Sequence, residues 1–192
     1  MLENYLERTN LQSGKKISVK AAVTVGLICL AVILPQIAHL AVGPSAGMTL
    51  LPMYLPALLG GCLLGAKWGL FTGILSPLAS FAVTSAFGSA MPAAARLPFM
   101  MAELAVFALV SGLFSNKIAK NALFAFPAVI AAEISGRGFF LLSVAALQGV
   151  TPLKTAVIWQ QIQTGFVGLA VQAVLVPLMV IAIKKIMDKE AK

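Results

Sequence analysis

Long apolar runs separated by short polar turns constrain this chain more than any other feature of its sequence. A helix needs about 20 consecutive apolar residues to cross the hydrocarbon core of a bilayer. Runs of about this length cover residues 19–40, 68–86, 97–115, 122–147 and 156–183, and a slightly shorter run covers 50–66. We therefore expect an all-α integral membrane protein with six transmembrane helices. Residues 1–192 would form a single membrane domain, of which residues 1–18 are a cytoplasmic N-terminal segment.

The composition supports lipid as the solvent for most of the chain. Hydrophobic residues make up 60% of the sequence and charged residues only 10%, whereas soluble domains carry about 25% charged residues. Glycines recur every four residues from Gly61 to Gly73. A single helix over 50–86 would be about 55 Å long, nearly twice the hydrocarbon core. Two helices that meet in a tight turn at Lys67 are therefore expected.

The distribution of cations predicts the orientation. With both termini in the cytoplasm, the cytoplasmic segments would hold eleven of the fourteen Lys and Arg residues: Arg8, Lys15, Lys16, Lys20, Lys67, Lys117, Lys120, Lys184, Lys185, Lys189 and Lys192. Only Arg96 and Lys154 would then lie outside, and Arg137 would lie within a helix. Cytoplasmic loops of membrane proteins carry an excess of Lys and Arg. This pattern favours cytoplasmic N and C termini.

Several functional classes fit the sequence poorly. The formal net charge is +8, but the cations lie in small clusters between apolar runs, so we expect no nucleic-acid binding. Cys29 and Cys62 lie inside apolar runs, where cysteine behaves as a small hydrophobic residue. One histidine and two separated cysteines predict no metal site.

Three ionisable residues lie where lipid disfavours charge. Glu103 falls in the fourth apolar run, and Glu133 and Arg137 fall in the fifth, four residues apart and so on one helix face. A charge at the bilayer centre costs about 2.5–3.5 kcal/mol on insertion scales, so such residues are usually paired or functional. Two interpretations follow: a structural ion pair between Glu133 and Arg137, or side chains that face a polar ligand.

The depths of these residues favour a shared site. At 1.5 Å per residue, Glu103 would lie about 10 Å below the outer surface, Arg137 about 15 Å and Glu133 about 21 Å. Gln160 and Gln163 would lie about 6–12 Å deep on the last helix, although glutamines also join helices without touching ligand. Polar groups from three helices thus gather in the outer half of the membrane. We expect a cup that opens to the outside.

Three further residues are candidate ligand contacts near the outer surface. Arg96 would suit a carboxylate or phosphate, while His39 and Met48 lie near the predicted first outer loop. A hydrogen bond at the membrane interface is the alternative for His39, and core filling is the alternative for Met48. Small residues at Ala22 and Gly26 allow close helix approach, either within the bundle or against a partner membrane protein.

Distinctive motifs follow the first predicted loop. They are Gly47-Met-Thr-Leu-Leu-Pro-Met-Tyr-Leu-Pro-Ala-Leu-Leu-Gly60, Gly65-Ala-Lys-Trp-Gly69, Gly73-Ile-Leu-Ser-Pro77 and the later Pro98-Phe-Met-Met-Ala-Glu103-Leu with Ser111-Gly112. Together they resemble the S components, or substrate-binding subunits, of energy-coupling factor (ECF) vitamin transporters. The resemblance covers roughly residues 19–185.

The resemblance implies a function and a set of partners. S components are six-helix subunits of the prokaryotic cell membrane that bind a vitamin or related micronutrient near the outer surface. They pair with a transmembrane scaffold subunit and two cytoplasmic ATPases, which use the ATP. Many contact the scaffold through an Ala-x-x-x-Ala pattern in the first helix, and the nearest match here is Ala22-x-x-x-Gly26. The chain has no Walker A motif, so it would not be the ATPase.

Two other functions remain as alternatives. An autonomous secondary carrier or channel is one, although the inverted repeats common in carriers are not evident. A membrane-embedded enzyme is the other, but such enzymes need clusters of Asp, His or Ser, so we expect no catalysis. The ligand class also stays open, because arginines would suit an anion whereas Glu103 and Glu133 would suit amino or hydroxyl groups.

Overall fold

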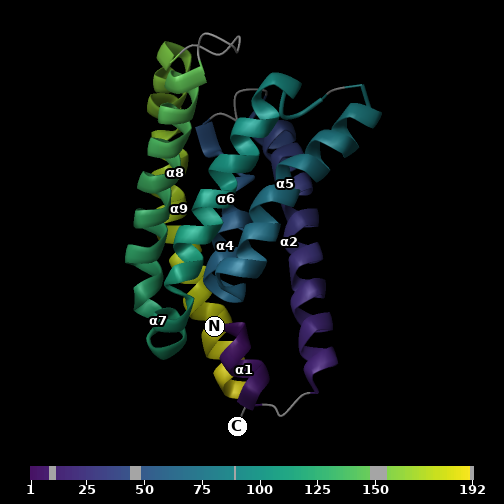
Figure 1. Ribbon diagram of the computed structural model, residues 1–192, viewed down its shortest axis with the longest axis vertical. Helices are drawn as coiled ribbons and strands as arrows, with labels where there is room; N and C mark the ends of the chain where they lie inside the picture. The colour runs from purple at the N-terminus through teal and green to yellow at the C-terminus, as the bar shows by residue number, and fades with distance from the viewer. Residues whose placement is uncertain (9–11, 44–48, 89, 148–154, 191–192) are drawn as a thin grey trace.

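The computed structural model describes residues 1–8, 12–43, 49–88, 90–147 and 155–190, and every regular element in these ranges is a helix (Figure 1). The α-helices are α1 (Leu2–Arg8), α2 (Ser13–Val42), α4 (Tyr54–Leu64), α5 (Ala66–Ala86), α6 (Leu97–Leu113), α7 (Ser115–Lys120), α8 (Ala125–Leu147) and α9 (Thr155–Glu190). Short 3-10 helices, η1 (Ala94–Arg96) and η2 (Ala122–Phe124), precede α6 and α8. The prediction of an all-α chain is confirmed for the described residues.

Five of the described helical segments are long and apolar enough to cross a membrane. They are Ser13–Ala41, Ala66–Ala86, Ala94–Leu113, Ala122–Leu147 and Ile158–Glu190. Large apolar side chains on their outer faces are exposed, among them Val25 at 58%, Leu142 at 71% and Phe166 at 68%. Apolar surface of this extent is covered by lipid or protein in stable molecules. These helices indicate a multi-pass membrane protein.

The second predicted spanning helix is shorter than expected. We predicted 50–66, but α4 covers only Tyr54–Leu64 and has 11 residues, a length of about 16 Å or half the hydrocarbon core. Leu51 and Gly65, just outside its two ends, have positive φ angles of 50° and 84°, which are incompatible with a continuing right-handed helix. Ten of the 11 residues of α4 are buried. It therefore lies inside the bundle and shows little surface to lipid.

Three other helix boundaries differ from the prediction. α2 begins at Ser13 rather than at 19, and α9 continues to Glu190 rather than ending at 183. The segment 1–18, predicted only as a cytoplasmic extension, contains α1, in which Leu6 is 2% exposed, and Met1 directly before it is 4% exposed. These ends carry many polar and charged residues, so their hydropathy alone did not indicate helix.

Glycines hold α4, α5 and α6 at close range, as the four-residue spacing predicted. A Cβ added at Gly69 of α5 would lie 2.8 Å from Gly61 Cα of α4. A Cβ added at Gly73 would lie 2.8 Å from the Leu104 carbonyl carbon of α6. Any larger residue at these positions would force the backbones apart. These glycines therefore serve packing within the bundle.

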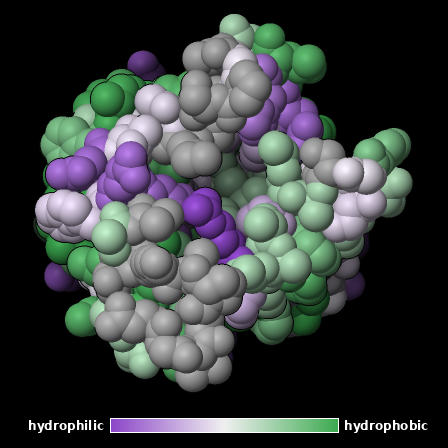
Figure 2. Space-filling view, turned by 90° about the horizontal axis from the view of Figure 1, so that it is seen from above, coloured by the Kyte–Doolittle hydropathy of each residue, from purple (hydrophilic) through white to green (hydrophobic). Residues whose placement is uncertain are grey.

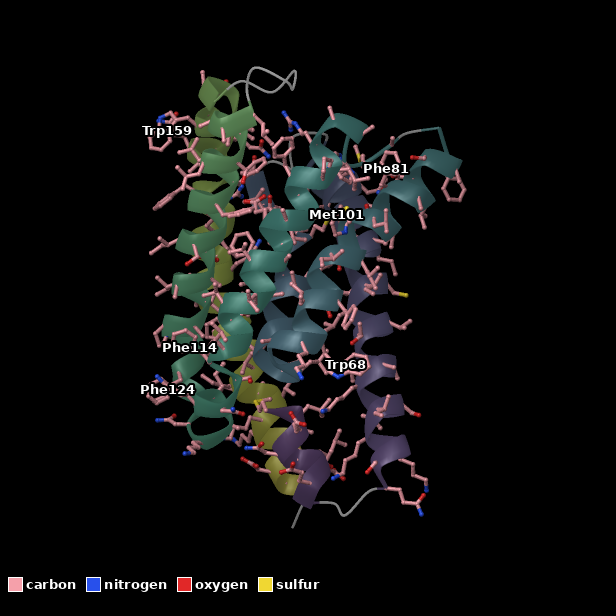
Figure 3. All side chains as sticks on the ribbon, in the orientation of Figure 1. Trp68, Phe81, Met101, Phe114, Phe124 and Trp159 are labelled. Carbon is pink, nitrogen blue, oxygen red and sulfur yellow. The ribbon has the colours of Figure 1, made fainter. Side chains whose placement is uncertain are left out.

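The two chain termini lie at the same end of the bundle (Figure 1). We call the opposite end the distal end; there α2 and α5 finish and α6 begins, at Val42, Ala86 and Leu97. Aromatic side chains occur near both ends: Trp159 and Phe81 toward the distal end, and Trp68, Phe114 and Phe124 toward the other (Figure 3). Tryptophan is enriched at both membrane–water interfaces, so this placement suits a bundle that spans a bilayer.

Candidate functional site

A cavity of about 240 Å³ lies at the distal end of the bundle. Its lining comes from α2, the segment before α4, the segment before α6, and α9. The lining residues are Pro35, His39, Leu51, Pro52, Met53, Tyr54, Met91, Pro92, Ala93, Arg96, Met100 and Gln161. Seen from above, the molecule is hollowed near the middle of this face, and hydrophilic residues lie along part of the rim (Figure 2). The cavity thus combines a mainly apolar frame with a few polar side chains.

Helical spacing places two pairs of lining residues. Pro35 and His39 are four residues apart on α2, and Arg96 and Met100 are four residues apart at the start of α6. Residues with this spacing lie on one helix face. Arg96 directly precedes α6 and ends the 3-10 helix η1. These elements direct His39 and Arg96 toward the same space.

Hydroxyl groups of α5 form hydrogen bonds with the backbone of Met91, which lines the cavity. Met91 N donates a hydrogen bond of 2.8 Å to Thr84 Oγ1, and Ser80 Oγ donates one of 2.9 Å to Met91 O. Both backbone groups of Met91 are therefore fixed to the end of α5. This anchoring sets the position of the Met91–Arg96 segment over the cavity.

Gln172 of α9 holds the wall on the other side. Its side-chain amide Nε2 donates to Leu50 O at 3.0 Å and to Leu51 O at 2.8 Å. Gln172 is only 3% exposed. The two carbonyl groups belong to the segment before α4, and the Gln172 amide supplies a hydrogen-bond donor to each of these buried acceptors. Gln172 thus connects α9 to the segment that forms the cavity wall.

A buried ion pair lies directly behind the cavity. Arg137 Nη1 of α8 lies 3.0 Å from Glu103 Oε1 of α6. Tyr54, a cavity residue, donates its hydroxyl hydrogen bond to Glu103 Oε2 at 2.9 Å. The Arg137 guanidinium carbon lies 4.8 Å from the centre of the Tyr54 ring, a cation–π distance. Tyr54 therefore separates the ion pair from the cavity while contacting both charged groups.

Glu133 does not form the expected pair with Arg137. No ion pair between these two residues is present in the described part of the chain, and Arg137 contacts Glu103 instead. Glu133 is 7% exposed, and its Oε1 atom has no hydrogen-bond partner among the described residues. Of the two interpretations, the intrahelical pair is therefore not formed, because the neighbouring helix α6 brings the Glu103 carboxylate closer to the guanidinium than the next turn of α8 brings Glu133.

The structure brings two of the predicted ligand contacts to the cavity. Arg96 and His39 line it, whereas Glu103, Glu133 and Arg137 are not among its lining residues. Gln160 and Gln163 are exposed and also lie outside the lining. The residue between them, Gln161, lines the cavity instead. Met48 lies outside the described residues.

The predicted docking residues lie on the outer surface of α2. Ala22 and Gly26 are both exposed, and a Cβ added at Gly26 would meet no atom within 4 Å. They are therefore not used for helix packing within the described part of the bundle. Their role in contact with a partner stays a prediction.

Sequence reasoning missed Tyr54, Gln161, Gln172 and the pair Ser80 and Thr84 as parts of the site. Tyr54 and Gln172 carried a usable signal, since each is a polar side chain inside an apolar run, where it needs a hydrogen-bond partner. Gln161 could not be told from its neighbours, because a helix turns by 100° per residue and its rotation is set by packing.

The cavity is suited to reversible binding of a small polar molecule. Its polar groups can donate hydrogen bonds from Arg96, His39 and Gln161, and its remaining surface is apolar. Binding pockets commonly have this composition. Within the described ranges, no group of three His, Cys, Asp or Glu residues is placed to hold a metal ion.

Comparison of the chain with protein-family models, curated proteins and solved structures finds no significant match. The likeness to S components therefore depends on the motifs in the sequence.

Proposed function

We propose that this chain is the substrate-binding subunit of an ECF-type importer and binds a small water-soluble micronutrient in the distal cavity. The observation that carries the proposal is the cavity itself, about 240 Å³ in volume and lined by Arg96, His39 and Gln161 in an apolar frame. Its place at the end away from both termini matches where the sequence motifs lead us to expect a ligand.

The charge distribution supports an outward-facing cavity. Eleven of the fourteen Lys and Arg residues fall in the segments that the topology expected from the sequence places on the side of the termini. In the described part, Lys184 Nζ donates to Lys120 O at 3.1 Å, so two of these cationic segments meet. The positive-inside rule assigns this end to the cytoplasm. The distal cavity would then open toward the outside of the cell membrane.

The exposed face of α2 supports docking of a second membrane protein. Ala22 and Gly26 are small and exposed, and a Cβ added at Gly26 would meet no atom within 4 Å. Surfaces made of small residues allow close helix contact. In the proposed complex a transmembrane scaffold subunit packs there, and two cytoplasmic ATPase subunits supply the energy. This chain contributes the ligand site.

Purification of the full chain from a mild detergent tests the proposal. A tagged chain, expressed in the organism that encodes it, should copurify with a larger membrane subunit and two ATPases. Denaturation of the purified protein should release a small molecule. Liposomes that contain only this chain should not transport that molecule. If the chain purifies alone and drives uptake under an ion gradient, it is an autonomous carrier and the proposed function is wrong.

A further inference from the structure

The acidic residues of this chain are kept away from the distal cavity. Four of the six lie near the termini, and the other two are Glu103 and Glu133. Neither of these two lines the cavity. The ranges whose structure is not described, 9–11, 44–48, 89, 148–154 and 191–192, contain no acidic residue by sequence. No carboxylate of a side chain is therefore available at this end to bind a cationic group of a ligand.

The carboxylate that contacts the cavity residue Tyr54 is buried and paired with an arginine. Glu103 is 0% exposed and contacts Arg137 Nη1 at 3.0 Å through one oxygen and the Tyr54 hydroxyl at 2.9 Å through the other. Arg137 offsets its charge, and the lining residue Tyr54 contacts both members of the pair. Glu103 thus adds little negative potential to the space where a ligand would bind.

The polar groups that do line the cavity are available to a ligand. The Arg96 guanidinium forms no hydrogen bond or ion pair with the described part of the chain, and His39 has no side-chain hydrogen bond there either. Gln161 Oε1, a hydrogen-bond acceptor, is buried without a partner among the described residues, so it suits a donor group on the ligand body rather than the anionic oxygens. An arginine without a carboxylate partner is the side chain best suited to bind a planar carboxylate or a phosphate through two hydrogen bonds.

The size and frame of the cavity limit the rest of the ligand. Its volume of about 240 Å³ falls below the roughly 300–1,000 Å³ of pockets that hold drug-sized molecules. Proline, leucine and methionine side chains form most of the frame, including Pro52, Met53 and Met100. The ligand body is therefore compact and at least partly apolar, which excludes molecules as large as a corrinoid.

We propose that the distal cavity selects a small organic anion, a carboxylate or phosphate monoester whose charged group binds Arg96 and whose apolar body contacts the proline and methionine frame. This inference rests on the proposed function and assigns the substrate class that the sequence left open. Arg96 is the residue that sets specificity, while His39 and Gln161 supply additional hydrogen bonds.

The test compares molecules that differ only in the anionic group. The full chain in lipid nanodiscs is titrated with nicotinate and nicotinamide, pantothenate and pantothenol, and pyridoxal phosphate and pyridoxal. In parallel, the small molecule released from purified protein is identified by mass spectrometry. We expect an anion in the released fraction, and binding of at least one anionic probe tenfold or more tighter than its neutral counterpart. Arg96→Gln should remove this preference, while Lys67→Gln, a control at the opposite end, should keep it.

The outcomes separate this inference from the proposed function. If the wild-type chain releases or prefers a neutral or cationic molecule, or if Arg96→Gln leaves the preference for the anion unchanged, the anion assignment is overturned while the binding function stands. If no molecule of any charge is released and none of the probes binds, both are overturned.

Discussion

Arg137 and Glu103 join α8 to α6 through a contact of 3.0 Å between Nη1 and Oε1, and both side chains are almost completely buried. Tyr54 of α4 completes the group with a 2.9 Å hydrogen bond to Glu103. Three helices that are far apart in sequence thus meet at one set of polar atoms. Because an unpaired charge in a lipid-surrounded interior is costly, this group is expected to fix how the three helices pack.

Removing one member of the ion pair should destabilise the fold strongly. Arg137→Met leaves Glu103 buried without its partner, and breaking a buried pair typically costs about 3–5 kcal/mol. Thermal unfolding in detergent should show a large decrease in Tm. The double variant Glu103→Gln/Arg137→Met should recover a substantial part of the loss, since no uncompensated charge remains. Equal stability of Arg137→Met and the wild type would contradict a structural role for the pair.

The Tyr54 hydroxyl should matter separately from the Tyr54 ring. Tyr54→Phe removes the donor to Glu103 Oε2 but keeps the ring over Arg137, and a buried acceptor left without its donor costs about 1–3 kcal/mol. Tyr54→Leu removes the ring as well and should cost more. Chemical denaturation of both variants measures the two contributions. If Tyr54→Leu costs no more than Tyr54→Phe, the ring contact does not contribute, and if Tyr54→Phe is as stable as the wild type, the hydroxyl bond does not contribute.

Adding one carbon at Gly69 should disturb the packing of α5 on α4. The new Cβ would lie 2.8 Å from Gly61 Cα, and overpacking of this kind typically costs about 1–3 kcal/mol. Gly138→Ala is the matched control, because Gly138 is exposed on α8 with nothing within 4 Å. The control should be neutral or slightly stabilising, since alanine is a better helix former than glycine. Similar unfolding temperatures for the two variants would show that the close approach of α5 to α4 does not limit the size of the residue at position 69.

A large side chain at Gly26 should separate assembly from ligand binding. Gly26→Leu adds bulk to the exposed face of α2 and should reduce copurification of the scaffold subunit at least tenfold. Ligand binding by the isolated chain should not change, because Gly26 is not a lining residue of the cavity. Gly138→Leu places the same bulk on α8 and should leave assembly intact. If the Gly26→Leu variant still copurifies with the scaffold subunit, the docking surface lies elsewhere on the molecule.

Hydropathy located the helices well but gave poor estimates of their ends. The five long runs all appear as helices, because about 20 apolar residues in sequence have few other stable conformations in lipid. α4 was predicted too long, since the residues at 51–53 are also apolar but form a turn before the helix begins. The helical residues at 13–18 and 184–190 were missed because they are polar. Length and hydropathy therefore predicted which segments are helical better than where each helix ends.

Of the charged residues predicted to contact a ligand, Arg96 lines the distal cavity, whereas Glu103, Glu133 and Arg137 do not. Counting residues from a helix end gives the depth of a side chain but not the direction in which it points. Depth placed Glu103 and Arg137 in the same layer, and they do meet. Their partners, however, are each other and Tyr54, because the rotation of α6 and α8 is fixed by packing with α4. The same reason explains why Gln161, rather than Gln160 or Gln163, lines the cavity.

The glycine contacts among α4, α5 and α6 also determine which parts of the molecule are free to open. The backbones of α4 and α5 approach closely at Gly61 and Gly69, and those of α5 and α6 at Gly73 and Leu104, so we expect the three helices to move as one rigid body. Admission of a solute then falls to α2 and α9, which contribute His39 and Gln161 from outside that body. Spin labels at Cys29 and Leu78→Cys should report a changed distance when solute is added. A second pair, at Leu78→Cys and Leu109→Cys in a Cys29→Ser background, should not.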